Sequence, residues 1–214
     1  MVSDHVLPPF PPSILVVCKT CLMFFLFIFC YNIIYHISIK CRGNLEIKKI
    51  IIHKDYCNNN TQVHDIALLK LKKKVDLSMF PPACLAPKDA NYTGNTASVY
   101  GWGREIETPA PPPCVNPLPP ISPVLKETTQ IILSNDECKQ GSGLVPCCVD
   151  GISRECRVSM RDLFTDDMLC GIKSGTSSCQ GDSGGPLTVE ENGRHTLVGI
   201  VSWSFGCARV SIHK

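Results

Sequence analysis

One short segment, Cys179-Gln-Gly-Asp-Ser-Gly-Gly-Pro186, combines the residue types that covalent chemistry on a carbonyl group requires. Ser183 supplies a hydroxyl group that could act as a nucleophile. Gly181, Gly184 and Gly185 have no Cβ, so the backbone around the serine can turn sharply and bring its N–H groups close to a substrate oxygen. A serine hydroxyl is a weak nucleophile by itself and needs a histidine to take its proton and a carboxylate to orient that histidine. The segment therefore requires a histidine and a carboxylate elsewhere in the chain.

The same segment resembles the active-site signature of the trypsin-like (chymotrypsin-fold) serine proteases, and three other segments agree with it. Asp65-Ile-Ala-Leu-Leu-Lys-Leu71 resembles the segment that carries the triad aspartate, and Tyr100-Gly-Trp-Gly103 resembles a mid-chain strand and turn. Gly199-Ile-Val-Ser-Trp203 resembles the substrate-binding strand, and the order of the segments is that of the family. The resemblance covers residues 45–208 and implies a serine endopeptidase.

This resemblance implies a role for each of several residues. Ser183 is the nucleophile, and its N–H group forms an oxyanion hole together with the N–H group of Gly181. Asp65 orients the catalytic histidine, although a lone aspartate in this position could also simply cap a strand. Asp182 pairs with the new N-terminal amine that activation cleavage releases, and this pairing shapes the oxyanion hole.

The histidine that this chemistry requires is not evident. In the family it lies upstream of the aspartate in a Thr-Ala-Ala-His-Cys type segment, and this chain contains nothing similar. His36 lies in an apolar stretch, and His53 resembles a surface histidine of the family. His64 directly precedes Asp65, and its side chain should therefore point away from the position of the base. An activation sequence of the Ile-Val-Gly-Gly type is also missing, so we expect a fragment of a protease that is inactive as written.

Four residues bear on substrate specificity. The position at the base of the family's primary specificity pocket is Ser177 here, and not an aspartate that would bind a substrate Lys or Arg. Ser202 and Trp203 end the substrate-binding strand, and Ser204 replaces a glycine that usually leaves the pocket open. We expect a narrow pocket that accepts apolar side chains of middle size.

The chain contains 14 cysteines, which indicates an oxidising compartment and a secreted protein. The resemblance implies the disulfides Cys138–Cys170 and Cys179–Cys207, and it implies that Cys84 tethers an upstream pro-region. Of the adjacent Cys147 and Cys148, we expect one to pair with Cys156, because neighbouring cysteines bridge to each other only with strain. We expect no metal and no cofactor.

Short β-prone runs separated by turn residues indicate an all-β fold. They include residues 47–52, 66–71, 97–100, 128–133, 186–189 and 196–203. The proline-rich residues 108–123 should form an exposed loop, and residues 139–169 a long loop. The family implies a chymotrypsin-like double β-barrel that is incomplete at both ends, since residues 209–214 replace its final strand and helix. Such barrels would have unpaired strand edges.

Residues 1–44 form a separate hydrophobic segment, and residues 13–39 are apolar enough for a membrane anchor. The basic residues that follow this stretch would leave the protease part in the cytoplasm, against its disulfides, so the segment is either an anchor or not native to the domain. The net charge of +2 does not indicate nucleic acid as a partner. The predicted partners are protein or peptide substrates, and the sequons at Asn59 and Asn91 fit a secreted glycoprotein. The alternative function is that of a non-catalytic protease homologue, secreted or membrane-anchored, which binds or regulates.

Overall fold

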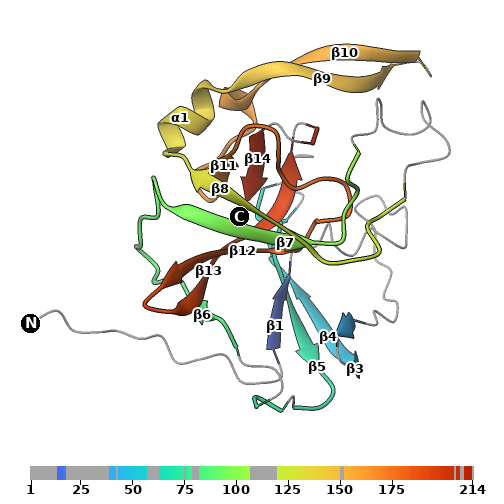
Figure 1. Ribbon diagram of the computed structural model, residues 1–214, viewed down its shortest axis with the longest axis vertical. Coiled ribbons are helices and arrows are strands. Elements are labelled where there is room, and N and C mark those ends of the chain that lie inside the picture. The colour runs from blue at the N-terminus through green and yellow to red at the C-terminus, as the bar shows by residue number, and fades with distance from the viewer. Residues whose placement is uncertain are drawn as a thin grey trace, which may run out of the picture.

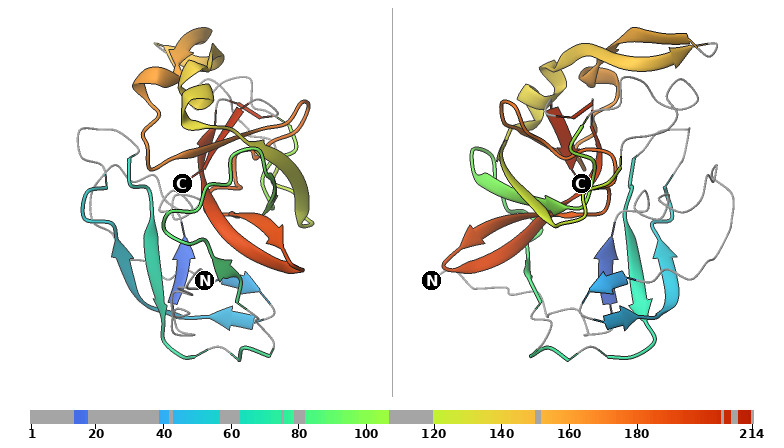
Figure 2. Two further views of the ribbon diagram at one scale, coloured as in Figure 1. Left: turned by 90° about the vertical axis from the view of Figure 1, so that its left-hand side faces the viewer. Right: turned by 45° about the vertical axis from the view of Figure 1, so that its right-hand side comes forward.

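The computed structural model describes residues 14–17, 39–41, 43–56, 63–74, 76–78, 82–106, 120–149, 152–204, 206–207 and 210–213. This part of the chain is nearly all-β, as the sequence predicts, with a short α-helix and a single 3₁₀ turn among the strands. Figure 1 shows the smaller sheet at one end of the molecule and a projecting β-ribbon at the other, and Figure 2 shows the same arrangement from two further sides.

The smaller sheet contains β1 (Ile14–Val17), β5 (Ala67–Leu71) and β4 (Ile47–Ile52) in the order β1-β5-β4. All its pairings are antiparallel. Alternate side chains of β5 are buried, because successive residues of a strand point to opposite faces. A separate short pair is formed by β2 (Ile39–Cys41) and β3 (Gly43–Leu45). Through β1, part of the apolar N-terminal segment pairs with β5 of the protease-like region.

The larger sheet has the order β12-β7-β8-β11-β14-β13-β6, and β12 also pairs with β13. Its strands are β6 (Cys84–Leu85), β7 (Thr96–Gly101), β8 (Lys126–Ile132), β11 (Leu169–Ile172), β12 (Pro186–Glu191), β13 (Arg194–Ser204) and β14 (Val210–His213). Its core consists of Tyr92, Ala97, Val99, Ile132, Leu187, Val189 and Val201. The β12–β13 hairpin turns at Asn192 and Gly193, whose φ angles of 52° and 72° suit a tight hairpin turn.

The tail of the chain takes part in this larger sheet. The strand β14 pairs with β11 on one side and with β13 on the other. Because β12 and β13 also pair, the strands from β12 through β7, β8, β11 and β14 to β13 form a closed ring. The expectation of an unpaired edge at this end is therefore corrected: residues 210–213 supply a partner strand for β11 and β13.

Residues 139–169 are more regular than the long loop expected from the sequence. The helix α1 (Asn135–Gln140) begins with a capping box between Ser134 and Glu137. β9 (Ser142–Val149) and β10 (Ile152–Ser159) form an antiparallel ribbon, and the 3₁₀ helix η3 (Met160–Asp162) follows. The sequence signal for this ribbon is Asp150-Gly151, a dipeptide that favours two-residue hairpin turns.

A second core lies under this region and includes the disulfide Cys138–Cys170. Met160, Phe164 and Met168 are buried around the disulfide, and Trp203 packs against them. Cys156 is also disulfide-bonded. The side chains of Cys147 and Cys148 lie outside the described residues, so the expected pairing of one of them with Cys156 stays a prediction.

Several other expectations fall on residues that the structure does not describe. They concern His36, the sequon at Asn59 and residues 108–119, which are most of the proline-rich segment. In the described part of the chain, no helix is long and apolar enough to cross a membrane. Residues 18–38 lie outside that part.

Candidate active site

The Ser183 turn is fixed by main-chain hydrogen bonds within itself and to β13. The N–H group of Asp182 donates to the carbonyl oxygen of Cys179 (3.0 Å), and that of Gly185 donates to the carbonyl oxygen of Asp182 (2.8 Å). Gly184 donates to Val201 at 2.8 Å, and Val201 donates back to Gly185 at 2.9 Å. Ser183 therefore lies in a tight turn whose far end is held on β13.

The N–H groups expected to form an oxyanion hole are available for a ligand. Gly181 has a φ angle of +105° and Gly184 one of +82°, conformations that glycine adopts without steric cost. Among the described residues, the N–H groups of Gly181 and Ser183 donate no hydrogen bond to another protein group. Unengaged N–H groups beside a hydroxyl are the arrangement that could bind the oxygen of a carbonyl under attack.

Asp65 is fully buried, with 0% of its surface exposed, and its carboxylate oxygen Oδ2 accepts a hydrogen bond from the hydroxyl of Ser202 at 2.8 Å. Ser202 itself is also buried. Since Ser202 follows Val201 directly, adjacent residues of β13 hold the Ser183 turn and the Asp65 carboxylate. Resemblance placed Ser202 on the substrate-binding strand, but no sequence signal revealed that its hydroxyl is directed toward Asp65.

The two described histidines near Asp65 in the sequence have other partners. The ring nitrogen Nδ1 of His53 accepts the N–H group of Asp55 at 3.3 Å. The Nδ1 atom of His64 lies 3.3 Å from the carboxylate of Asp167. Of the other two described histidines, His195 is exposed near the β12–β13 turn and His213 ends β14. The hydrogen bonds and ion pairs given for His53 and His64 thus lead to residues other than Ser183 and Asp65.

The carboxylate of Asp182 is enclosed by the turn that precedes the proline-rich segment. Its oxygens accept the N–H groups of Gly103 at 2.7 Å and of Cys179 at 2.9 Å. A Cβ added to Gly101 would lie 1.9 Å from the Asp182 oxygen Oδ1, and one added to Gly103 would lie 2.5 Å from its Cγ. The Asp182 side chain occupies the space that a side chain at position 101 or 103 would need. This explains the two glycines of the Tyr100-Gly-Trp-Gly103 segment.

Burial raises the pKa of Asp182, and the two N–H donors oppose this effect only in part. A raised pKa means that the folded chain binds the proton more tightly than the unfolded chain. The contribution of Asp182 to stability is therefore greatest at acid pH and is lost as the pH rises through the raised pKa.

We accordingly expect the unfolding free energy of the chain, relative to an Asp182→Asn variant, to fall as the pH rises from about 4 toward 7. Urea unfolding of both proteins at several pH values measures this difference. A difference that stays constant or grows across the range would contradict the assignment of Asp182 as a partly buried carboxylate with a raised pKa.

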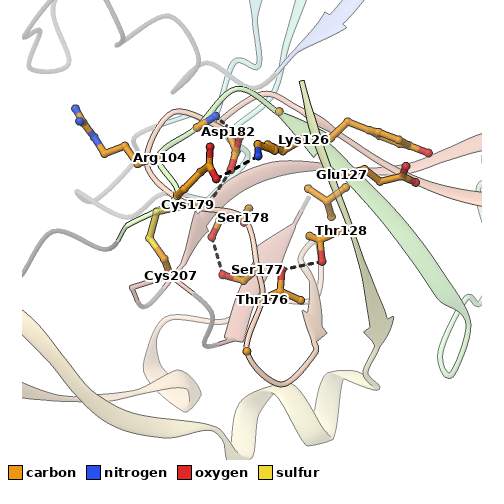
Figure 3. Close-up of a pocket in the computed structure, with 16 residues that line it drawn as sticks. Arg104, Lys126, Glu127, Thr128, Thr176, Ser177, Ser178, Cys179, Asp182 and Cys207 are labelled. Atoms are coloured by element: carbon orange, nitrogen blue, oxygen red, sulfur yellow. Dashed lines mark hydrogen bonds and ion pairs between the residues drawn. A yellow bond between two sulfur atoms is a disulfide. The ribbon is translucent and has the colours of Figure 1, made fainter. Parts of the chain in front are cut away.

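A cavity of about 260 Å³ lies beside Asp182 (Figure 3). It is lined by Val99, Tyr100, Gly101, Gly103, Arg104, Glu105, Lys126, Glu127, Thr128, Gly175, Thr176, Ser177, Ser178, Cys179, Asp182 and Cys207. The disulfide Cys179–Cys207 forms part of the wall. Lys126 and Glu105 form an ion pair at 3.2 Å, and the hydrogen bond from Lys126 lowers the pKa of Glu105. Sequence reasoning did not identify this pair, because neither residue belongs to a motif.

The residues expected to determine specificity lie around the same region. Ser177 lines the cavity, and its hydroxyl donates to the carbonyl oxygen of Ser178 at 2.7 Å. Ser204 donates to the carbonyl oxygen of Gly206 at 2.8 Å, which fixes the end of β13. Trp203 packs against the second core. Both disulfides implied by the resemblance are present, and Cys84 is a free thiol among the described cysteines. No cluster of metal-binding side chains occurs in the described residues.

Comparison with known proteins gives one family. A family model described as Trypsin matches residues 36–212. The chain is 34% identical to Serine proteinase stubble of Drosophila melanogaster over 170 residues, which cover 78% of this chain and 19% of that protein. It is 30% identical to Transmembrane protease serine 7 of Rattus norvegicus over 186 residues, which cover 81% of this chain and 19% of that protein.

The chain therefore belongs to the trypsin family of serine proteases. It spans 19% of the length of each of these two relatives. The family match begins at residue 36, inside the hydrophobic segment that the sequence analysis set apart, and extends through most of the tail.

Proposed function

We propose that this chain is part of a serine endopeptidase that hydrolyses peptide bonds through an acyl-enzyme on Ser183. The observation that carries the proposal is the attachment of the Ser183 turn and of Asp65 to adjacent residues of β13. Residues far apart in the sequence are thereby brought to one strand, as a catalytic nucleophile and a carboxylate that orients its base require.

In the proposed reaction, the Ser183 hydroxyl oxygen attacks the carbonyl carbon of the scissile peptide bond and gives its proton to a general base. The N–H groups of Gly181 and Ser183 stabilise the negative oxygen of the tetrahedral intermediate. The intermediate collapses, the base protonates the leaving amine, and water then hydrolyses the acyl-enzyme. Asp65 orients the base, for which we propose a histidine that is none of those discussed above. The chain as written therefore does not complete the reaction.

We further propose that Asp182 receives a cationic amine when the protease is activated. Support comes from its raised pKa and from its position on the wall of the cavity. A neighbouring amine would favour the ionised carboxylate and offset the cost of its partial burial. Until then, the N–H groups of Gly103 and Cys179 hold the carboxylate.

Secretion, glycosylation at Asn91 and a tether through Cys84 complete the proposal. Disulfides favour an oxidising compartment, and Asn91 is exposed at the surface. The thiol of Cys84 is partly exposed on β6, beside β13, so it is available for a bond to an upstream segment.

For the primary specificity, we propose apolar side chains of middle size, because Ser177 places no negative charge in the pocket. In the whole protein, Ser177→Asp should raise the kcat/KM for substrates with Lys or Arg before the cleaved bond, relative to apolar ones, by about a hundredfold or more. Cleavage of a peptide library by purified protein measures this ratio.

The matched control is Ser174→Asp, which adds the same charge at an exposed position of the same loop. It should leave the ratio unchanged. An equal change in both variants would contradict the assignment of Ser177. A whole protein without any Ser183-dependent cleavage would instead support the alternative, a non-catalytic homologue that binds its partners, anchored or secreted.

A further inference from the structure

The backbone conformation of His64, the residue directly before Asp65, is unusual. Its φ angle is +53°, in the left-handed region that residues with a Cβ rarely adopt. The other described residue of this kind, Asn192, lies in a hairpin turn before a glycine, where such a conformation is common. His64 lies in a short turn before β5 rather than in a hairpin, and the N–H group of Ile66 donates to its carbonyl oxygen at 2.8 Å. Its further contacts support this conformation.

Those contacts converge on one carboxylate. The backbone N–H group of His64 donates to the Asp167 oxygen Oδ2 at 3.3 Å, and the ring nitrogen Nδ1 lies 3.3 Å from the same oxygen. The other oxygen of Asp167 accepts a hydrogen bond from the hydroxyl of Thr165. Asp167 is therefore held in place on its own loop and engages both the main chain and the side chain of His64.

Asp167 lies in the region of the second core, and His64 leads into the smaller sheet. Phe164 and Met168, on either side of Asp167 in the sequence, are buried beside the disulfide Cys138–Cys170. Val63, on the other side of the contact, packs against that same core. The contact therefore links parts of the fold that are 103 residues apart in the sequence.

We propose that His64 is a positioning residue for Asp65. It acts through its main-chain and side-chain contacts with Asp167, which together are called the clasp. Asp65 is fully buried and has two neighbouring anchors. The hydroxyl of Ser202 binds its carboxylate, and the clasp fixes the backbone just before it. The catalytic importance of this position rests on the proposed function. The existence of the clasp does not.

Charge alone does not explain the clasp. The His64 and Asp167 side chains are 39% and 35% exposed, and ion pairs at such sites contribute little. The His64 ring also stacks on His53, with ring centroids 4.6 Å apart, and His53 lies near Asp55. The backbone hydrogen bond and the left-handed conformation distinguish this contact from an ordinary surface ion pair.

Hydrogen exchange measured by mass spectrometry tests the proposal without any need for activity. His64→Ala and Asp167→Ala should each accelerate exchange in residues 63–71 by about tenfold or more. The first variant removes the ring contact and places an alanine in the left-handed conformation, and the second removes the acceptor of both His64 contacts. His64→Asn should stay within about threefold of the wild type, because asparagine tolerates the left-handed conformation and its amide can donate to Asp167. The matched control is His53→Ala, which removes the ring that stacks on His64 and the acceptor of the Asp55 N–H group but leaves the contacts with Asp167, and it should also stay within about threefold.

The acceleration must be local. Amides of β7 and β12, in the core of the larger sheet, should keep their wild-type rates in all variants. Equal acceleration there would show that His64→Ala only destabilises the whole fold, and it would contradict the proposal. So would wild-type exchange of residues 63–71 in both alanine variants.

Should the alanine variants fail to fold, Asp167→Asn carries the test, since it keeps an oxygen acceptor and loses the charge. A local increase of about threefold or more would support the clasp, and no increase would contradict it. Neither result depends on whether Ser183 is an active nucleophile, so failure of this proposal and failure of the proposed function remain distinguishable.

Discussion

Replacing Gly185 with alanine is expected to lower the unfolding free energy of the chain by about 3 kcal/mol, the upper part of the usual range for overpacking a filled site. A Cβ at this position would lie 2.6 Å from the carbonyl oxygen of Tyr100 and 2.8 Å from that of Asp182. Both are backbone atoms, so neither can move aside as the end of a side chain could. The Ser183 turn would have to open, since Gly185 donates to Asp182 and accepts from Val201.

Gly94→Ala is the matched control for this substitution. Gly94 has a φ angle of +82°, and a Cβ there meets no atom within 4 Å. Its replacement should cost about 1 kcal/mol, the cost of a left-handed conformation without any clash. Urea unfolding of both variants gives the comparison. Equal losses would mean that the space around Gly185 is not as tightly filled as the structure indicates.

The fold class and family follow from the sequence because they depend on short local motifs. A glycine-rich turn around a serine, a Gly-Trp-Gly turn and alternating apolar strands are each determined by neighbouring residues. The disulfides Cys138–Cys170 and Cys179–Cys207 followed from the same resemblance, and both are present. Such motifs identify the fold class and the family even when the contacts between distant residues are not known.

Contacts between distant segments could not be predicted in the same way. The pairing of β14 with β11 and β13 depends on an edge that is available in space, and residues 210–213 match no motif. The hydrogen bond from Ser202 to Asp65 joins residues 137 apart in the sequence. The clasp of His64 with Asp167 was missed for the same reason.

The expectation of a long loop over residues 139–169, where the β9–β10 ribbon lies, is wrong for a different reason. The dipeptide Asp150-Gly151, which favours hairpin turns, lies in the sequence between the two strands, so a ribbon was predictable from neighbouring residues.

Labelling by a fluorophosphonate probe, which reacts with activated serine nucleophiles, tests the central claim most directly. We expect the chain as written, once shown to be folded by circular dichroism, to be labelled no more than its Ser183→Ala variant. The reason is that, among the described residues, the hydrogen bonds and ion pairs given for His53 and His64 lead to residues other than Ser183 and Asp65, so we infer that the Ser183 hydroxyl is not activated. In a well-studied serine protease, loss of the histidine lowers turnover about a million-fold.

On the proposed function, a longer form of the protein that carries the proposed histidine upstream of Asp65 should in contrast be labelled at Ser183, and its Ser183→Ala variant should not. Clear Ser183-dependent labelling of the isolated chain would contradict the account, because it would mean that a base already lies within these residues.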